Sequence, residues 1–385
     1  MLRVSALLVV CGLAVAGCGG GGDDGPTTTA TTATPRTTTT EATTTRADAG
    51  GLARGWSVAA ALRELPPLPG DRVEVATADL DAATRAGGLR RPSRPTGAAM
   101  TAWLGPLTGG PKAAPLFVPL PTMLDARGIA QADQVERELG WSLRTIGAYG
   151  EVAAPPYRFL VARDSGRFAD GLERLPDGVV SAGRGADLRI DPRATTAARP
   201  LGQPLRMARR GPLLAAGPRT ATVAAWRAGD PAGTLADDQA LASLAARLDA
   251  EHVLAAQLLR GNFGPAGVGA RATPAQLREL VARLLPQRFD AVGLGWTVDG
   301  RRPAIVAVYH FADAPTATEA RPALERLWRD GRSTISAQPL AQLVTVEGSS
   351  ADGDAVTVRL RPGPRGSAAT VAQMLVRRDL PFGHR

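Results

Sequence analysis

The side chains that could do chemistry in this 385-residue chain are few and widely spaced. There are two cysteines, both within the first 18 residues, three histidines and a single lysine, Lys112. The zinc-binding patterns H-x-x-x-H and H-E-x-x-H do not occur, and neither do G-x-S-x-G, S-x-x-K or a phosphate-binding loop. The sequence therefore predicts neither a metal site nor another cofactor, and no familiar nucleophile arrangement.

Histidine would be the natural general base at neutral pH. His310 alternates with Val306 and Val308 in a strand-like stretch, so an ordinary buried or edge position is the simpler interpretation, with a base or binding residue as the alternative. His252 follows Asp249 and Glu251 in a segment typical of a protein surface. The site candidates from this group therefore reduce to His310.

Three close pairs of aspartates are the other possible chemistry: Asp79/Asp81, Asp237/Asp238 and Asp352/Asp354. Two carboxylates across a cleft would serve glycoside hydrolysis, but such clefts usually also carry aromatic side chains for stacking on sugars. This chain has only 7 Phe, 6 Trp and 3 Tyr. Helix caps, helix dipoles and a turn explain the three pairs more simply.

The N-terminus carries the most specific pattern. A short positive segment, Met1–Arg3, precedes an apolar run, Val4–Val15, that is too short to span a bilayer as a mature helix. The run ends in Val15–Ala16–Gly17–Cys18, which resembles the lipobox of bacterial lipoproteins. The resemblance implies that the Cys18 thiol takes a diacylglyceryl group and that a peptidase cleaves between Gly17 and Cys18. An ordinary secretory signal cleaved elsewhere is the alternative.

The lipobox resemblance implies a lipid-anchored protein on the extracytoplasmic face of the cell membrane. Residues 1–17 would be the signal peptide. Residues 18–50, which combine the lipidated cysteine with a Gly- and Thr-rich tract that has no apolar periodicity, would be a disordered tether. Fatty chains such as palmitate on Cys18 would hold the chain at the membrane, because each buried CH₂ contributes about 0.8 kcal/mol.

The positive charge of the chain does not point to nucleic acid. Lys and Arg number 45 against 36 Asp and Glu, giving +9, and 44 of the 45 cations are Arg. The excess is even, because residues 51–250 carry 25 basic and 20 acidic groups and residues 251–385 carry 17 and 12. Nucleic-acid binding would require a concentrated basic stripe with stacking aromatics. We therefore expect no nucleic-acid partner, and only weak attraction to anionic lipids.

Residues 51–385 show alternating strand and helix patterns. Period-2 alternation and turn residues predict strands, whereas 3.6-residue periodicity predicts helices. Thr273, Pro274 and Gln276 have the spacing of a capped helix start. Asp299–Gly300 and Gly217–Pro218 are hairpin-turn signals between expected strands. Strands are expected at 73–80, 157–163, 213–216, 220–226, 253–260, 289–298, 304–311, 343–346 and 355–360, and helices at 132–139, 168–175, 235–248, 274–285, 315–329 and 367–376.

This order predicts an α+β fold with mostly antiparallel sheets and helices on one face. Residues 51–250 and 251–385 would be two α+β units and diverged repeats, with chance recurrence of the order as the alternative. Leu139–Gly140–Trp141 and Leu294–Gly295–Trp296 are the clearest echo. Trp141 and Trp296 would anchor core packing, or else mark equivalent pockets of the two units.

The sequence favours a non-enzymatic lipoprotein that binds an apolar or amphiphilic ligand, or an envelope protein partner. The folded region resembles only uncharacterised exported lipoproteins of the actinobacterial type. A cell-envelope hydrolase that uses carboxylates in a cleft between the units is one alternative. A structural or assembly role in the envelope is another.

Overall fold

A computed structural model describes residues 51–110, 112–124, 126–265, 273–300 and 302–385. For Pro274, Gln276, Leu277 and Leu280 it describes the backbone alone. Gly17, Cys18 and the expected tether lie outside the described residues. None of the helices in the described part combines the length and the apolar character that crossing a bilayer requires.

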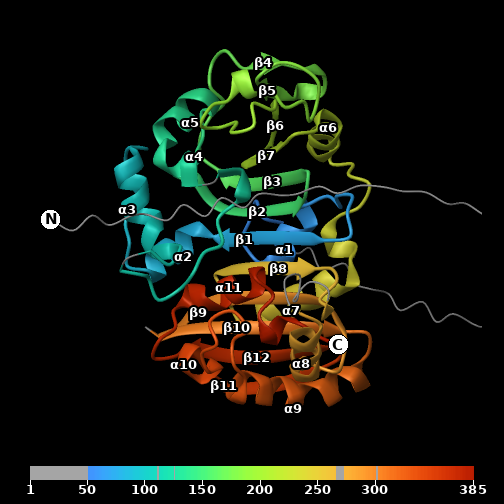
Figure 1. The fold of residues 1–385 in the computed structure, drawn as a ribbon. Coiled ribbons are helices and arrows are strands. Elements are labelled where there is room, and N and C mark those ends of the chain that lie inside the picture. The colour runs from blue at the N-terminus through green and yellow to red at the C-terminus, as the bar shows by residue number, and fades with distance from the viewer. Residues whose placement is uncertain (1–50, 111, 125, 266–272, 301) are drawn as a thin grey trace, which may run out of the picture. The chain divides into compact units, whose positions relative to one another are not determined.

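Twelve strands in the described part form one antiparallel sheet (Figure 1). The neighbours β1 and β8 join the two halves of the chain, with Val75 opposite Leu258. In sheet order the strands are β11 (Val344–Asp352), β12 (Ala355–Pro362), β10 (Arg302–Phe311), β9 (Phe289–Asp299), β8 (Ala255–Arg260), β1 (Val73–Asp79), β2 (Ile146–Ala154), β3 (Tyr157–Asp164), β7 (Leu213–Gly217), β6 (Leu205–Arg210), β5 (Val180–Ala182) and β4 (Glu173–Arg174). The predicted α+β class and antiparallel pairing are confirmed.

Both faces of the sheet are buried, so the expectation of helices on one face was wrong. In β10, Ile305, Ala307 and Tyr309 belong to one apolar cluster, and Val306 and Val308 belong to the other. Successive side chains of a strand point to opposite faces. The long apolar runs of the strands, in place of clean alternation with polar residues, are the signature of a sheet covered on both sides.

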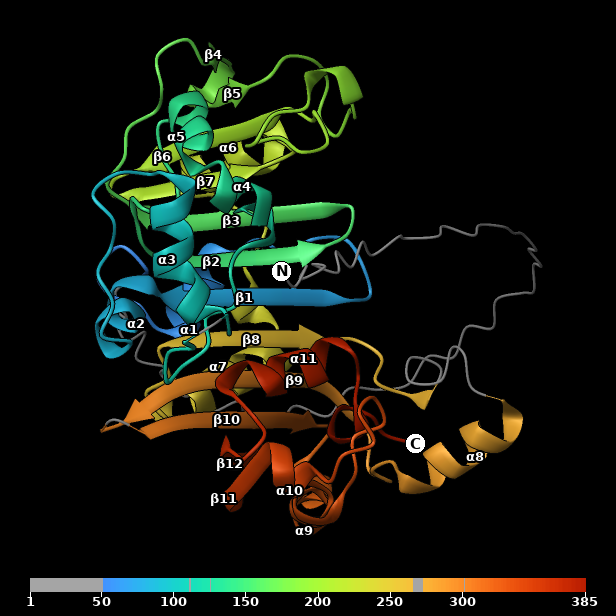
Figure 2. The same cartoon turned by 60° about the vertical axis from the view of Figure 1, so that its left-hand side comes forward.

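Different helices cover the two faces. The first face lies under α2 (Leu80–Ala86), α3 (Gly97–Leu107), α5 (Ala132–Leu139), α9 (Ala314–Asp330) and α11 (Ala368–Val376). The second lies under α1 (Val58–Glu64), α6 (Thr220–Ala228) and α7 (Gln239–Ala250). The short helices α4 (Ala126–Ala130) and α10 (Leu340–Leu343) connect larger elements, and α8 (Pro274–Arg283) stands away from the sheet (Figure 2).

Local signals fixed several element ends. Helix α5 ends at Gly140, whose φ of 83° suits a residue without a Cβ. Helix α8 begins at Pro274, and the β9–β10 hairpin turns at Gly300, as predicted. Pro322 lies inside α9 without ending it. Two predictions were wrong, because residues 220–226 belong to helix α6 and residues 168–175 are loop and β4.

The strands of the two halves follow the same order. From the centre outward the sheet reads β1-β2-β3-β7-β6 in one direction and β8-β9-β10-β12-β11 in the other. Helix α7 precedes β8 as α1 precedes β1, and both pack on the second face. The helices after the outer hairpins differ, since α6 packs on the second face and α11 on the first. The order of the strands therefore agrees with the predicted repetition, whereas the positions of the helices agree with it only in part.

Candidate functional site

The aspartate pairs of the described part are occupied by caps and ion pairs. The Asp79 side chain caps α2 by accepting from the Ala82 amide, and Asp238 caps α7 in the same way. Asp352 pairs with Arg247, and Asp81 accepts a hydrogen bond from Arg91. These contacts engage the carboxylates locally, and the two halves of the chain share one continuous sheet.

His310 lies in a chain of polar contacts that ties α7 to the sheet. Its Nδ1 is 2.6 Å from Oδ1 of Asp290, and its Nε2 is 3.3 Å from Oδ2 of Asp354. The Ser243 hydroxyl of α7 donates to Oδ1 of Asp354 at 2.7 Å. Nε2 is near enough to Asp354 for charge attraction but is not aligned for a hydrogen bond. Sequence reasoning considered His310 and Asp354 separately and did not connect them.

The surroundings of His310 favour a charged imidazole. Burial lowers its pKa, but the Asp290 hydrogen bond and the charges of Asp290 and Asp354 outweigh burial, so the pKa lies above the usual value. The pKa of Asp290 is lowered; burial alone would raise it, and the His310 contacts prevail. Both ring nitrogens face carboxylates. The arrangement is therefore that of an ion pair within the fold, with no free nitrogen to accept a proton from a substrate.

Trp141 and Trp296 both lie in the core of the first face. The indole of Trp141 donates to Sδ of Met207, and that of Trp296 donates to the carbonyl of Ala368 at 2.8 Å. Trp296 belongs to β9, whereas Trp141 precedes the first residue of β2. The two L-G-W segments therefore occupy different places relative to the equivalent strands, and each indole is fully engaged in packing.

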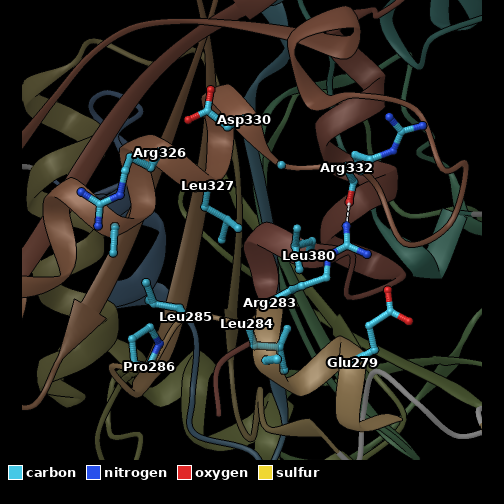
Figure 3. Close-up of a pocket in the computed structure, with 13 residues that line it drawn as sticks. Glu279, Arg283, Leu284, Leu285, Pro286, Arg326, Leu327, Asp330, Arg332 and Leu380 are labelled. Atoms are coloured by element: carbon cyan, nitrogen blue, oxygen red, sulfur yellow. Dashed lines mark hydrogen bonds between the residues drawn. The ribbon is translucent and has the colours of Figure 1, made fainter. Parts of the chain in front are cut away.

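A well-formed hollow lies between α8 and α9. We call it the α8–α9 groove; its volume is about 630 Å³. Figure 3 shows side chains of both helices and of the segment near Leu380 facing into it. Its lining consists of Glu279, Ala282, Arg283, Leu284, Leu285, Pro286, Ala323, Arg326, Leu327, Asp330, Gly331, Arg332 and Leu380.

The α8–α9 groove has an apolar base and a charged rim. Leu284, Leu285 and Leu380 are at most 2% exposed and form the base. Leu327, from α9, is only half-buried and continues this apolar surface toward the opening. The rim carries three arginines, Arg283, Arg326 and Arg332, against two acids, Glu279 and Asp330. An apolar base with a few charged groups at its edge is the usual make-up of a site for small molecules.

The rim arginines differ in how they are held. Arg283 donates to the carbonyl of Arg332 at 3.2 Å (Figure 3). Arg332 donates to the carbonyl of Ala337 at 2.8 Å. The Arg326 guanidinium makes no ion pair or hydrogen bond with another described residue. Its guanidinium is exposed at the opening of the groove, where it is available to a negatively charged group.

Helix α8 is fastened at its C-terminal end. The Arg385 guanidinium donates to the carbonyls of Val281 and Ala282, at 3.2 and 2.7 Å, and the Arg385 amide donates to the carbonyl of Leu285. Basic groups suit the end of a helix, where carbonyls lack intrahelical partners. The groove wall formed by α8 is thus set by the last residue of the chain, which the sequence pattern did not indicate.

Neither a known family model nor a curated protein nor a solved structure matched the chain when it was compared with them.

Proposed function

We propose that this chain is a non-enzymatic, lipid-anchored binding protein of the extracytoplasmic membrane face. Its ligand would be an amphiphilic anion held in the α8–α9 groove. The single observation that carries this proposal is an apolar base beneath an arginine rim in one open groove. The lipobox resemblance at Gly17–Cys18 supplies the anchor and the compartment.

The apolar base supports a hydrocarbon ligand. Covering Leu327 and the neighbouring half-buried Ala323 with methylene groups would remove apolar surface from water, which contributes about 0.8 kcal/mol per buried CH₂. The groove is open, so the ligand would lie along it with one side exposed. An open position also suits exchange of a ligand with a membrane or with another protein.

The rim supports a negative headgroup. Three arginines against two acids leave one positive charge at the edge of the groove. Arg326 is the member without a described partner, so a carboxylate or phosphate would meet its guanidinium without displacing an ion pair. Guanidinium binds either oxyanion through two parallel hydrogen bonds.

Titration calorimetry with dodecanoate, below its micellar concentration, tests the ligand class. The protein would be the chain from residue 18 onward carrying Cys18→Ser, which removes the predicted acylation. We expect micromolar to millimolar binding of dodecanoate and at least tenfold weaker binding of dodecyltrimethylammonium, which has the same chain and the opposite charge. Equal binding of the two probes, or of neither, would contradict the proposal.

Two variants of α9 locate the site. Arg326→Gln removes the unpaired rim charge, and we expect it to weaken dodecanoate binding five- to twentyfold. Arg329→Gln is the matched control, because Arg329 is an exposed cation of the same helix that pairs with Glu325 and does not line the groove. Equal effects of the two substitutions would place the ligand elsewhere. Capture of an envelope protein that blocks dodecanoate would instead favour the partner-protein function.

Metabolic labelling tests the anchor separately. We expect a palmitate analogue with a clickable tag to label the wild-type chain and Cys11→Ser, and to leave Cys18→Ser unlabelled. Cys11 is the matched control, because it lies within the apolar run that the lipobox resemblance removes. An unlabelled wild-type chain would overturn the anchor while leaving the groove proposal to its own test.

A further inference from the structure

A separate cavity of about 440 Å³ lies where the ends of β2 and β3 meet the start of α2 and the turn between β6 and β7. We call it the arginine pocket. Its lining consists of Asp81, Arg91, Arg144, Thr145, Gly147, Arg163, Asp164, Ser165 and Pro212. We propose that the arginine pocket binds a small monocarboxylate that also carries hydroxyl or ammonium groups, with Arg163 as its anchoring residue.

Two of the arginines build the pocket, and each is already paired with a carboxylate. One nitrogen of Arg91, Nη1, donates to the carbonyls of Leu143, Arg144 and Ile146, and Nη2 donates to Oδ1 of Asp81 at 2.7 Å. Arg144 donates through Nε and Nη2 to the Glu136 carboxylate. These contacts fix the wall between α2 and β2 before any ligand arrives, as preorganised sites require.

Arg163 is the exception among the pocket arginines. Its guanidinium lies 3.7 Å from Oδ2 of Asp81, too far for a hydrogen bond, and it donates to no other residue that the structure describes. Its side chain is 29% exposed. A Cβ on Gly147 would lie 2.6 Å from Asp81 Oδ2 and 3.3 Å from Arg163 Nε. A glycine at that position therefore keeps open the space in which the two charged groups face each other.

The charges around the pocket leave one cation without a dedicated partner. Arg91 is matched by Asp81 and Arg144 by Glu136, while Asp164 is matched by Arg209, which lies outside the lining. Arg163 shares Asp81 with Arg91. A single negative charge on the ligand would complete this balance, whereas a dianion would meet repulsion from Asp81. The pocket thus favours a monoanion over a dianionic phosphate.

The remaining polar groups call for donors on the ligand. Oδ1 of Asp164 is buried and accepts no hydrogen bond within the described residues, and Oδ2 of Asp81 has only the long contact to Arg163. An unsatisfied buried acceptor has a cost in folding free energy. Hydroxyl or ammonium groups beside the carboxylate would donate to the open oxygen of Asp81, and an ordered donor near Asp164 would remove that cost.

Hydrogen–deuterium exchange with D-glucuronate and L-serine as probes tests the proposal, on the chain from residue 18 onward carrying Cys18→Ser. Both probes combine one carboxylate with donor groups. We expect slowed exchange in residues 143–147 and 163–166, none with glucose, and much less with acetate at equal concentration. Protection by neither probe, or protection only outside these segments, would overturn the proposal. Stronger protection by inorganic phosphate would overturn the assignment to monocarboxylates.

Variants at two positions of β3 provide the matched comparison. Arg163→Gln is expected to weaken binding of the protecting probe at least tenfold, and Arg163→Lys to weaken it three- to tenfold, because an ammonium cannot bind both oxygens in a fixed plane. Arg158→Gln, at the other end of β3, should leave binding within twofold. Equal losses for Arg158→Gln and Arg163→Gln would overturn the role of Arg163. Neither result depends on the groove, whose residues lie on other elements.

Discussion

The imidazole Nδ1 of His310, in β10, lies 2.6 Å from Oδ1 of Asp290, in β9, at a point where the register between the two strands shifts. The shift leaves Asp290 of β9 without a paired residue on β10. Its carboxylate lies beside the His310 ring. With Asp354 on the other side of the ring, the charged imidazole joins strands β9 and β10 to the β11–β12 turn.

Replacing His310 by Gln should destabilise the fold in a pH-dependent way. The pKa of His310 is raised in the folded state, so its stabilisation is complete below the unfolded pKa of about 6.5 and is lost as pH rises through the folded value. We expect a loss of about 1–2 kcal/mol near pH 6, because Asp290 is largely exposed, and a smaller loss at pH 9. Urea unfolding of both proteins across this range measures the difference; an equal loss at pH 6 and pH 9 would argue against a charged His310.

Asp290, the partner of His310, gives the opposite dependence of stability on pH. The folded pKa of Asp290 is lowered, so its stabilisation is present above the unfolded pKa of about 3.9 and is lost as pH falls through the folded value. Asp290→Asn should therefore lose less stability relative to wild type at pH 3 than at pH 6. Thermal unfolding at the two pH values measures this, and a constant difference would rule out the ionised pair.

Glu151 predicts a third pH effect, from the interior. It is 1% exposed and accepts from the amides of Thr122 and Met123, at 2.5 and 2.9 Å. Burial raises its pKa in spite of these hydrogen bonds. An acid with a raised folded pKa loses stability as pH rises from its unfolded pKa of about 4.3 through the folded value. The stability advantage of wild type over Glu151→Gln should therefore shrink between pH 4 and pH 8, and an advantage that grows over this range would refute the raised pKa.

Two glycines at positive φ should respond differently to alanine. At Gly140 a Cβ would lie 1.8 Å from the carbonyl oxygen of Arg167, whereas at Gly300 it would meet nothing within 4 Å. We expect Gly300→Ala to cost about 1 kcal/mol, from backbone strain alone. Gly140→Ala should cost more than about 3 kcal/mol or prevent folding. Chemical unfolding of both variants measures the loss of stability. Similar losses would show that the backbone near Gly140 moves to accommodate the added methyl group.

The place of α7 predicts where the chain can be divided. Leu241, Leu244 and Leu248 of α7 pack with the second face of β8–β10, so α7 belongs to the second half of the sheet. Co-expressed fragments divided between Pro231 and Ala232 should reassociate, because this division keeps α7 and strands β8–β10 in the same fragment. Fragments divided between Ala250 and Glu251 should aggregate. Recovery of soluble complex measures both; better recovery from the later division would support the boundary expected from the sequence.

Local patterns predicted much of the fold, especially where turn chemistry was strong. Asp299–Gly300 fixed the β9–β10 hairpin, and Pro274 marked the start of α8. Residues 220–226 were misassigned because the strand that pairs with β7 is β6, upstream of it, and not the segment after Gly217. The two strands form a hairpin across Gly211–Pro212, so the turn lies within a short window of sequence, and the sequence analysis missed it.

The sites could not be found in the same way. Arg163 looked like one of many surface arginines, and its place depends on Gly147 and Asp81 from two other elements. The α8–α9 groove needs Arg385 to fasten α8 more than a hundred positions away in sequence. His310 was singled out from its residue type, but of its two carboxylate neighbours Asp290 comes from β9 and Asp354 from the β11–β12 turn. Contacts of this kind arise from topology.

The most direct test of a groove-binding, membrane-anchored protein is hydrogen–deuterium exchange of the acylated chain in nanodiscs of neutral lipid, with and without dodecanoate. We predict slowed exchange in α8 and in the second half of α9, and no such change in Leu327→Asp, which places a like charge on the apolar surface. Unchanged exchange in both helices of the wild-type protein at saturating dodecanoate would contradict the account.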